Sequence, residues 1–372
     1  MISDPPRPRS NDDQPDDLLT LDSAWLLAAL QAMAAETDGA LLRLGCAALL
    51  AALDDERSAL RSPDADGSLA RSRASLDAAI AQIAAAQGIE RAHYYVQRLL
   101  RSLTDVRTPA YSDINLNRWK EYDDLQTDSL WQIDGRDRGG GRSAAYWGNF
   151  VPQIPDQMIR RYTKRGDWVL DTFVGSGTTL IEARRLGRHA LGIELQPDVA
   201  ALANGALASG AANGAASQTM ARAVVGDATA FDYATLLAEH GVGEVQLVLM
   251  HPPYHDIIRF SDDARDLSNA PSVEQFLDGL ELAIDRAAAV LARGRHLVLV
   301  IGDTYSRGDW VPLGFLAMQR AQRCGLGLKS IVVKNVDGTL GKRMQKELWR
   351  YRALAGGFFV FKHEYLFVLR KP

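Results

Sequence analysis

Short apolar runs alternate with stretches of helical spacing along the second half of the chain. The apolar runs that predict buried strands lie at 169–170, 190–193, 223–225, 244–250, 295–301, 328–336 and 364–369. Apolar residues at helical spacing predict helices at 156–163, 178–186, 198–217, 276–291 and 312–324. Strands that alternate with helices are typical of an α/β fold with a mostly parallel sheet. The last two strands are predicted to close that sheet as an antiparallel pair.

The N-terminal third has a different pattern. From Leu18 to about Leu60, and again from Leu69 to Leu103, alanine and leucine recur at helical spacing. Residues 104–148 are polar and poor in aliphatic residues but contain several aromatic ones, which favours an extended arm or linker. The predicted organisation is a disordered tail at 1–17, a helical domain at 18–103, the arm at 104–148 and the α/β domain at 149–372.

Composition and charge narrow the class of protein. The chain has 372 residues, 47% of them hydrophobic, and a formal net charge of −4, so a local basic groove is compatible with it but a generally basic surface is not. Its two cysteines lie far apart, which predicts neither a disulfide framework nor a zinc cluster, and we expect no metal. No apolar run is long enough for a membrane span, and the first residues lack a secretory signal core. A reducing cytoplasm is the expected location.

The turn between the first two predicted strands has the residues of a nucleotide site. Gly175 and Gly177 allow the backbone to approach a ligand closely, and Thr178 and Thr179 can cap the next helix and receive an anion. Glu194 ends the following strand, where an acid can accept hydrogen bonds from both ribose hydroxyls. A glycine pair alone also occurs in ordinary strand-to-helix turns, and the spacing to Glu194 favours the nucleotide interpretation. The third glycine of GxGxxG is a leucine here, which argues against a pyrophosphate ligand.

Two later strands also end in candidate functional residues. His251 to Tyr254, the sequence HPPY, follow an apolar run directly, and two prolines cannot continue a central strand. The tetrapeptide is therefore predicted to turn out over the same crevice as the glycine turn. Asp227 follows the third strand, where it is placed either to bind an adenine amino group or to cap the next segment.

The densest cationic segment is 338–357, GTLGKRMQKELWRYRALAGG, with Glu347 as its one acid. We predict nucleic-acid contact there, with an ordinary surface helix as the alternative. The cations concerned are Lys342, Arg343, Lys346, Arg350 and Arg352. Two weaker candidates are the RDRGGGR segment at 136–142, which also fits a linker, and the arginines and tyrosines of 91–101, which also fit a solvated helix face.

Four segments together resemble the S-adenosylmethionine-dependent DNA methyltransferases that act on adenine N6 or cytosine N4. They are GNFVPQIP (148–155), DTFVGSGTTLIEA with GIEL (171–183 and 192–195), MHPPYHD (250–256) and HEYLFVLRK (363–371). The resemblance implies a Rossmann-like methyltransferase fold, a mostly parallel seven-stranded sheet with an antiparallel final strand, here preceded by a helical N-terminal region. It also implies double-stranded DNA as the partner and a role in DNA methylation, as in restriction-modification.

The resemblance assigns roles to individual residues. The cofactor-binding set that it implies is Phe150, Pro152, Asp171, Phe173, Gly175, Gly177, Thr178, Thr179, Glu194 and Asp227. The implied catalytic set is His251, Pro252, Pro253 and Tyr254, in which the first residue and the carbonyl of Pro252 accept hydrogen bonds from the target amine, and Tyr254 stacks on a flipped base. The family usually has Asp, Asn or Ser where this chain has His251. A neutral imidazole can accept such a bond and a protonated one cannot, so activity is expected to fall through the histidine pKa.

Two other hypotheses stay open at this level. An RNA methyltransferase acting on a guanine amino group has a similar cofactor loop and Pro-Pro-aromatic turn, and a non-catalytic partner subunit would tolerate the altered tetrapeptide. Candidate elements for reading DNA sequence are 339–357, 257–269, the 104–148 arm and the N-terminal helices, in that order. Those helices could also form a homodimer or dock a partner subunit, and their Ala-Leu pattern does not choose.

Overall fold

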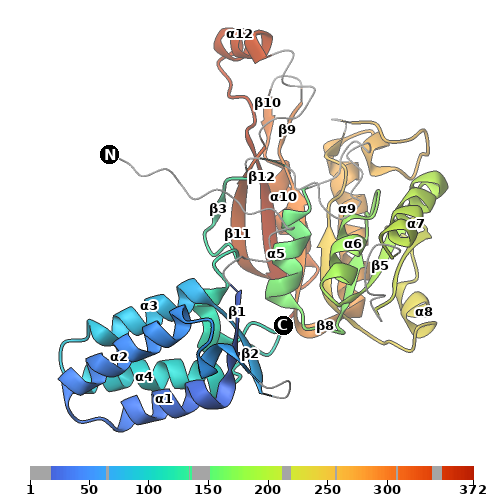
Figure 1. Cartoon of the computed structure of the whole chain (residues 1–372). Helices are drawn as coiled ribbons and strands as arrows, with labels where there is room; N and C mark the ends of the chain where they lie inside the picture. Colours follow the sequence, from blue (N-terminus) through green and yellow to red (C-terminus); the bar gives the residue numbers. More distant parts are fainter. Residues whose placement is uncertain are drawn as a thin grey trace. The chain divides into compact units, whose positions relative to one another are not determined.

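The computed structural model describes residues 18–63, 67–133, 135, 151–211, 219–255, 258–306, 309–336 and 346–372. The predicted tail, the RDRGGGR segment, Phe150, Lys342 and Arg343 lie outside these residues. The chain divides into two compact units (Figure 1). The helical unit comprises Met1–Pro109 and Ile114–Leu125, and the sheet unit comprises Ala110–Asp113 and Gln126–Pro372.

The sheet unit is built on an eight-stranded sheet with the order β3-β11-β12-β8-β7-β4-β5-β6. The strands are β3 (Leu130–Trp131), β4 (Trp168–Asp171), β5 (His189–Glu194), β6 (Ala221–Val225), β7 (Val245–Met250), β8 (Leu291–Ile301), β11 (Gly327–Asn335) and β12 (His363–Arg370). Neighbouring strands from β8 to β6 are parallel, and β12 lies antiparallel between β8 and β11. The predicted mostly parallel sheet with an antiparallel final strand is confirmed. Residues 130–131, which lie within the predicted arm, add an eighth strand parallel to β11.

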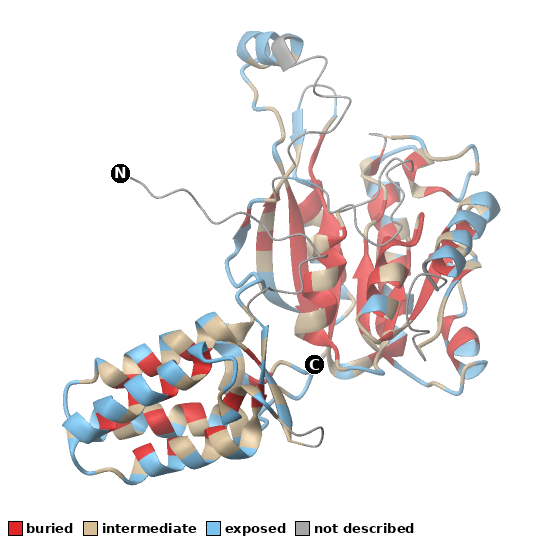
Figure 2. Cartoon of the chain, in the orientation of Figure 1, coloured by how far each residue is buried: buried red, intermediate tan, exposed pale blue. Residues whose placement is uncertain are grey.

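Helices cover both faces of this sheet, and each face has its own apolar core (Figure 2). One core includes α5 (Gln153–Tyr162), α6 (Thr178–Arg185) and α7 (Pro197–Ala211), and the other includes α8 (Tyr233–Ala238), α9 (Val273–Val290) and α10 (Leu313–Arg323). Successive strand residues contribute to opposite cores, as Val248 and Leu249 of β7 do. Because both faces are buried, the strands appear in the sequence as continuous apolar runs.

A hairpin and a helix follow the strands at the sheet edge where β8 and β11 end. The hairpin pairs β9 (Thr304–Ser306) with β10 (Asp309–Val311), and the helix is α12 (Lys346–Gly356). The ring of Tyr305 lies 4.8 Å from that of Phe361, centroid to centroid, and its hydroxyl donates to the Phe359 carbonyl at 2.8 Å. These contacts join the hairpin to the chain that leads from α12 into β12.

The helical unit contains two short strands that the sequence pattern did not predict. Its elements are β1 (Leu18–Asp22), α1 (Ser23–Ala35), α2 (Gly39–Asp54), η1 (Ala59–Arg61), β2 (Ser68–Ser72), α3 (Arg73–Ala84), α4 (Ile89–Thr104) and η2 (Leu116–Glu121). The prediction that 18–60 and 69–103 are purely helical was wrong at their first residues. Each strand has only five residues and runs directly into a helix, so its apolar positions merged with the helical pattern. β1 and β2 pair with each other antiparallel.

Candidate functional site

Three neighbouring strands end at the centre of the sheet and bring the predicted residues together. β4 lies between β5 and β7, and its last residue, Asp171, is in register with Gly192 of β5 and Leu249 of β7. Parallel strands present their carboxyl ends at the same edge, so Asp171, Glu194 and His251 all reach that edge. The prediction that the tetrapeptide and the glycine turn face one crevice agrees with this register.

The glycine turn has the backbone that its sequence requires. Gly175 and Gly177 have φ values of 52° and 90°, in the left-handed region that favours glycine. A Cβ on Gly177 would lie 3.0 Å from the Cβ of Ala203 in α7, and one on Gly192 would lie 2.5 Å from Val174 Cγ2. Sequence analysis singled out Gly192 only as part of GIEL, although a glycine inside a buried strand is a signal of close approach.

Glu194 fastens this turn to the end of β5. Its Oε2 accepts a hydrogen bond from the Gly175 amide at 3.0 Å, and its Oε1 accepts one from the Gln196 amide at 3.0 Å. The side chain is 9% exposed, and burial raises the pKa of its carboxyl group. Each carboxylate oxygen has more than one acceptor position, so Glu194 can hold the turn and accept from a ligand at once.

Three polar side chains around the turn are at most 1% exposed, namely Asp171, Thr172 and Thr179. The Thr179 hydroxyl interacts with the Asp171 carboxyl group, and Thr172 Oγ1 has no hydrogen-bond partner among the described residues. Asp171 Oδ1 accepts from the Phe173 amide at 3.0 Å. A buried polar atom left unsatisfied costs about 1–3 kcal/mol. This group therefore matches a ligand that brings polar atoms of its own, with hydroxyls able both to donate and to accept.

Replacing Asp171 with Asn is expected to raise the free energy of unfolding of the ligand-free protein above pH 6. Burial raises the pKa of Asp171 to about 6, whereas an unfolded aspartate titrates near about 3.9. Above the folded-state value the native chain holds a buried charge that the unfolded chain leaves in water, and below about pH 4 both states are protonated. Urea unfolding of both proteins at about pH 8 and about pH 4 measures this. An equal difference at the two pH values would contradict it.

The remaining predicted cofactor residues have varied surroundings. Pro152 is buried at the N-cap of α5, and Phe173 packs against the core that contains α8 to α10. Thr178 begins α6 and is 4% exposed. Asp227 Oδ1 accepts from the amide of Thr229 at 2.9 Å and from its hydroxyl at 2.7 Å, within the turn that follows β6. The helix α8 that comes next is capped by Asp232 instead.

Half-buried His251 and Tyr254 form one end of a polar chain whose other end, Glu364 and Lys334, is buried, and sequence analysis missed this chain. His251 Nε2 lies 3.0 Å from the Tyr254 hydroxyl oxygen, and that hydroxyl donates to Glu364 Oε2 at 2.9 Å. Lys334 Nζ donates to the other oxygen of Glu364 at 2.9 Å. Lys334 belongs to β11 and Glu364 to β12, and they are 5% and 8% exposed. The signal available in the sequence was a lysine inside the apolar run IVVKN.

This chain of hydrogen bonds selects one tautomer of His251. Because the Tyr254 proton is directed to Glu364, the Tyr254 oxygen accepts the proton of His251 Nε2, and the lone pair of the imidazole is then on Nδ1. Burial lowers the pKa of His251 to about 4, so the ring is neutral at physiological pH. The Tyr254 ring packs against Gly302, where a Cβ would lie 3.0 Å from Tyr254 Cε2.

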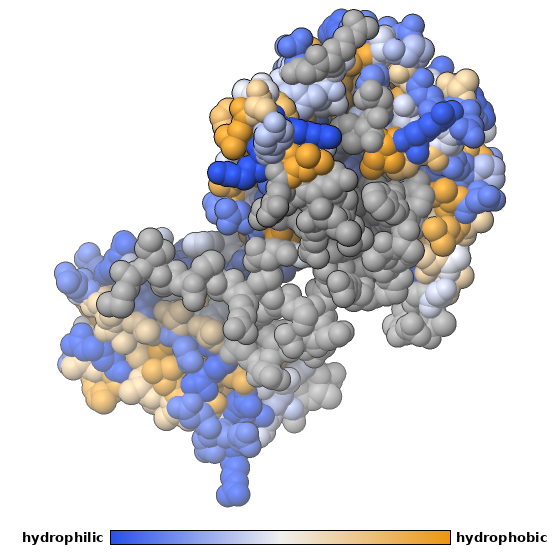
Figure 3. Space-filling view, turned by 90° about the horizontal axis from the view of Figure 1, so that it is seen from above, coloured by the Kyte–Doolittle hydropathy of each residue, from blue (hydrophilic) through white to orange (hydrophobic). Residues whose placement is uncertain are grey.

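The described part of the cationic segment lies beyond the same sheet edge. β11 is antiparallel to β12 and β12 to β8, so β11 ends at the edge where His251 lies. Arg350 and Arg352 of α12 are exposed, and the Arg352 guanidinium lies 5.3 Å from the Trp349 ring centroid. The side chain of Lys346 is outside the described residues. Figure 3 shows the molecule from above, the side on which Figure 1 draws α12. On this face, hydrophilic and hydrophobic side chains lie next to one another.

Two features are absent from the part of the chain that the structure describes. No group of three or more His, Cys, Asp and Glu side chains is arranged to hold a metal ion. No helix there combines the length and the hydropathy that a membrane span requires.

Comparison with known proteins finds a likeness to DNA methyltransferases over part of the chain. A family model described as DNA methylase matches residues 82–205. The type II methyltransferase M2.LlaDCHI of Lactococcus lactis subsp. cremoris is 31% identical over 126 residues, which are 33% of this chain and 39% of that protein. M2.DpnII of Streptococcus pneumoniae is 32% identical over 110 residues, 28% of this chain and 33% of that protein.

Each of these similarities covers only part of the related protein. The chain spans between 10% and 39% of the length of the curated relatives that it matches. Among solved structures, TrmN from Thermus thermophilus matches with a TM-score of 0.38 and 22% identity, over 62% of this chain and 51% of that one. That structural likeness is too low to bear on function, and the sheet order described above carries the fold assignment.

Proposed function

Because the chain belongs to the family of DNA methyltransferases that methylate amino groups, we propose that it methylates the exocyclic amine of cytosine (N4) or adenine (N6) in double-stranded DNA, with S-adenosylmethionine as the methyl donor. The observation that supports this most directly is the register of β5, β4 and β7. It brings the glycine turn, Glu194 and His251 to adjoining strand ends.

The residues around the glycine turn fit the proposed cofactor. The ribose hydroxyls and the methionine amino group of the cofactor are hydrogen-bond donors. Glu194 and Asp171 Oδ2 can accept from them, and both residues lie at the strand ends where this kind of sheet binds nucleosides. The Thr172 hydroxyl, which has no hydrogen-bond partner among the described residues, provides a donor for the carboxylate of the cofactor, and the Thr179 hydroxyl beside Asp171 provides a second one. When bound, the cofactor supplies an electrophilic methyl group. Phe150, Pro152, Phe173 and Asp227 keep their proposed cofactor roles, as do Gly175, Gly177, Thr178 and Thr179 in the turn.

Replacing Glu194 with alanine is expected to weaken cofactor binding by about 1–3 kcal/mol, the range for a lost charge-assisted hydrogen bond. The loss has two physical causes, since Glu194 both accepts from the ligand and holds the Gly175 amide. Calorimetry with S-adenosylhomocysteine measures it. Asp198→Ala, which removes an exposed acid from the first turn of α7, is the matched control and should bind normally. Equal affinity of Glu194→Ala and the control would refute the ribose role.

The tetrapeptide supplies the groups that an exocyclic amine needs. Such an amine is a poor nucleophile because its lone pair is delocalised into the ring, and acceptors for its two hydrogens help the nitrogen become tetrahedral. We assign one acceptor to His251 Nδ1 and the other to the Pro252 carbonyl, with Pro253 fixing the turn. The half-buried ring of Tyr254 is assigned to stacking on a flipped base, held at its hydroxyl end by Glu364.

The DNA-contacting surface in this proposal is the cationic segment, together with the hairpin joined to it. Exposed Arg350 and Arg352 adjoin exposed apolar residues of the same helix, among them Tyr351 at 70% and Leu354 at 72% exposure. Cations position a protein on phosphates, while apolar and aromatic groups contact bases and sugars. Lys342, Arg343 and Lys346 belong to the same proposed surface.

Incubation with tritiated-methyl S-adenosylmethionine and either duplex DNA or total RNA tests the proposal. Nucleoside analysis should find label in N4-methylcytosine or N6-methyladenine from the duplex and none in RNA. Label confined to RNA guanine would replace the proposal with RNA methylation. Label in neither nucleic acid, for a protein that binds S-adenosylhomocysteine, would identify a non-catalytic cofactor-binding subunit.

A further inference from the structure

The helical unit consists of two similar halves. Each half is a strand followed by two helices, and buried positions in the first half recur 50 residues later in the second. Leu26, Leu30 and Met33 of α1 correspond to Leu76, Ile80 and Ile83 of α3, and Leu42, Cys46 and Leu49 of α2 correspond to Ala92, Val96 and Leu99 of α4. The caps agree as well, since Asp22 and Ser72 each accept from the amide three residues on.

The two halves are related by an approximate local two-fold axis. β1 and β2 pair antiparallel with Thr20 opposite Ala70, which are themselves equivalent positions. α1 packs against α4, and α2 packs correspondingly against α3. The two halves therefore share one core. Equivalent positions have the same backbone surroundings, so a difference between their side chains is not imposed by the backbone.

Among the equivalent positions that differ between the halves, four come together in space on the second half. Where the first half has Leu21, Gly45, Ala48 and Ala51, the second has Arg71, Tyr95, Arg98 and Arg101. The first set is apolar or small, and the second is cationic and aromatic. The first half folds in the same way with the small and apolar residues at these positions. The fold of the second half therefore does not require its cations.

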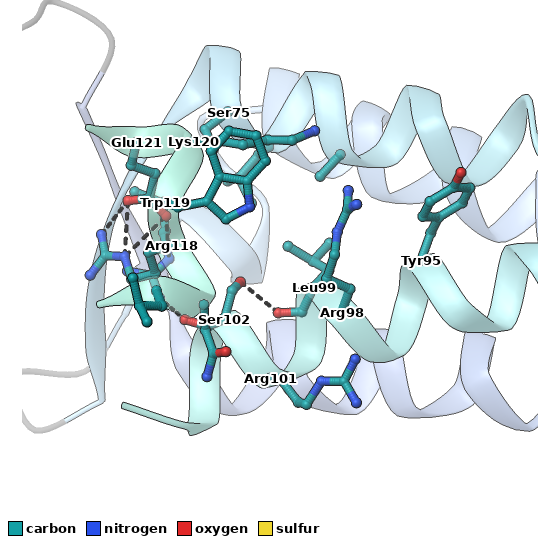
Figure 4. Close-up of a pocket in the computed structure, with 15 residues that line it drawn as sticks. Ser75, Tyr95, Arg98, Leu99, Arg101, Ser102, Arg118, Trp119, Lys120 and Glu121 are labelled. Carbon is teal, nitrogen blue, oxygen red and sulfur yellow. Dashed lines mark hydrogen bonds and ion pairs between the residues drawn. The ribbon is translucent and has the colours of Figure 1, made fainter. Parts of the chain in front are cut away.

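The divergent residues line a pocket of about 210 Å³ whose other wall is η2 (Figure 4). η2 adds Arg118, Trp119, Lys120 and Glu121, so five cations and one carboxylate surround the pocket in a chain of net charge −4. Glu121 is already paired with Arg118, with Arg118 Nε 3.0 Å from both of its oxygens. The pocket is thus strongly positive.

Arg71 shows most clearly that these cations are more than a surface feature. It takes the place of the core residue Leu21, is 3% exposed, and donates to the Ser102 carbonyl at 2.8 Å. Its Nε has no hydrogen-bond partner among the described residues and lies 4.0 Å from Glu121 Oε1, a carboxylate that Arg118 already shares. Burial, followed by the neighbouring charge of Arg118, lowers its pKa. A buried guanidinium in place of leucine costs stability, and an anion in the pocket would offset that cost.

We propose that this pocket is a second nucleic-acid site, one that holds the phosphodiester backbone of DNA through its cations and a sugar or base through Trp119. The Arg101 side chain has no hydrogen-bond or ion-pair partner in the described structure, and the Trp119 side chain is 61% exposed. Among the described residues, Lys120 Nζ makes a hydrogen bond of 3.4 Å to Gln82 Oε1 and no ion pair. An exposed indole next to cations that no carboxylate neutralises is the combination that contacts bases and phosphates together. A free phosphate would need converging donors, whereas here the cations are spread along α4 and η2.

Fluorescence anisotropy of a labelled DNA duplex, titrated with the full-length chain at several salt concentrations, tests this site. The double variant Arg101→Ala/Lys120→Ala should bind roughly ten-fold more weakly and lower the salt slope by about 2, one for each phosphate that the variant no longer neutralises. Trp119→Ala should weaken binding about five-fold or more without changing the slope. The matched control is Arg43→Ala/Arg57→Ala, which removes the same charge from exposed positions of the first half and should bind normally.

Three results would overturn the proposal. One is equal DNA affinity of the pocket and control variants, each confirmed as folded by circular dichroism. Another is an equal reduction of affinity in both, which would mean that only net charge matters. The third is competition by inorganic phosphate or by a mononucleotide at concentrations too low to screen DNA binding by salt alone, which would assign the pocket to a small anion. None of these results depends on methyl transfer, so the proposed activity is tested separately.

Discussion

His251→Phe is expected to reduce the rate of methyl transfer to DNA by about 100-fold or more while leaving S-adenosylhomocysteine binding nearly unchanged. Phenylalanine keeps an aromatic ring of similar size but removes both imidazole nitrogens. The target amine then loses the acceptor at Nδ1, and a single positioned acceptor or donor typically accounts for a factor of about 10² or more. The measurement is tritium transfer under saturating cofactor, with calorimetry for binding.

His251→Asn separates the acceptor role from the size of the ring. An asparagine side chain offers a carbonyl acceptor that does not titrate, so this variant should keep much of the activity that His251→Phe loses. The pH dependence should differ as well. Burial lowers the pKa of His251 to about 4, so the imidazole stays neutral, and able to accept, until the pH approaches that value.

The expected pH window therefore lies lower than the one that the sequence predicted. Wild-type turnover, relative to His251→Asn at the same pH, should be constant from about pH 8 to about pH 5 and should fall below that. A ratio that stays constant to about pH 4 in folded protein would remove His251 from the acceptor role. A fall centred near about 6.5 would instead show that the imidazole is more solvated than the structure has it.

Glu364→Ala is expected to destabilise the protein by about 3–5 kcal/mol, the range for breaking a buried ion pair by removing one partner. Lys334 would be left as a charge at 5% exposure, without the carboxylate 2.9 Å away. Replacing both residues, as in Lys334→Met/Glu364→Met, should recover most of this stability because neither charge remains buried. Urea unfolding followed by circular dichroism measures both variants.

The double variant also distinguishes a positioning role for Glu364 from a purely structural one. With stability recovered, the Tyr254 hydroxyl still lacks its acceptor, and nothing directs the His251 proton to Nε2. Turnover should stay low and the KM for DNA should rise, since Tyr254 is then held less firmly. Full recovery of turnover together with stability would show that Glu364 matters only for folding.

Local patterns were sufficient for the parts of the site that depend on local backbone. Gly175 and Gly177 were predicted as a turn in which a missing Cβ lets the backbone approach a ligand, and both adopt the positive φ that favours glycine. The strands of the sheet were visible because they are buried on both faces. The meeting of the turn with His251 was predicted from the resemblance to a family and from the rule that parallel strands end at one edge, whereas the order of the strands comes from the structure.

Long-range pairs were the parts that could not be predicted. Lys334 and Glu364 are 30 residues apart, and their pairing depends on the register of β11 with β12, which hydrophobic patterns do not encode residue by residue. β1 and β2 were missed because each merges into a helix. The 50-residue repeat was available in the sequence, but its identities are mainly Ala and Leu, which recur in any amphipathic helix.

The position of β12 links assembly of the sheet to completion of the site. β12 follows every other strand of the described sheet in chain order, yet it inserts between β8 and β11. Because β12 runs antiparallel, its second residue, Glu364, lies at the edge of the sheet where the parallel strands have their last residues. Pairings across such sequence separations form late in folding because the entropy of loop closure must be overcome first. A chain in which β12 has not inserted lacks Glu364, the partner of the Tyr254 hydroxyl, so we expect the proposed site to be complete only once the sheet is.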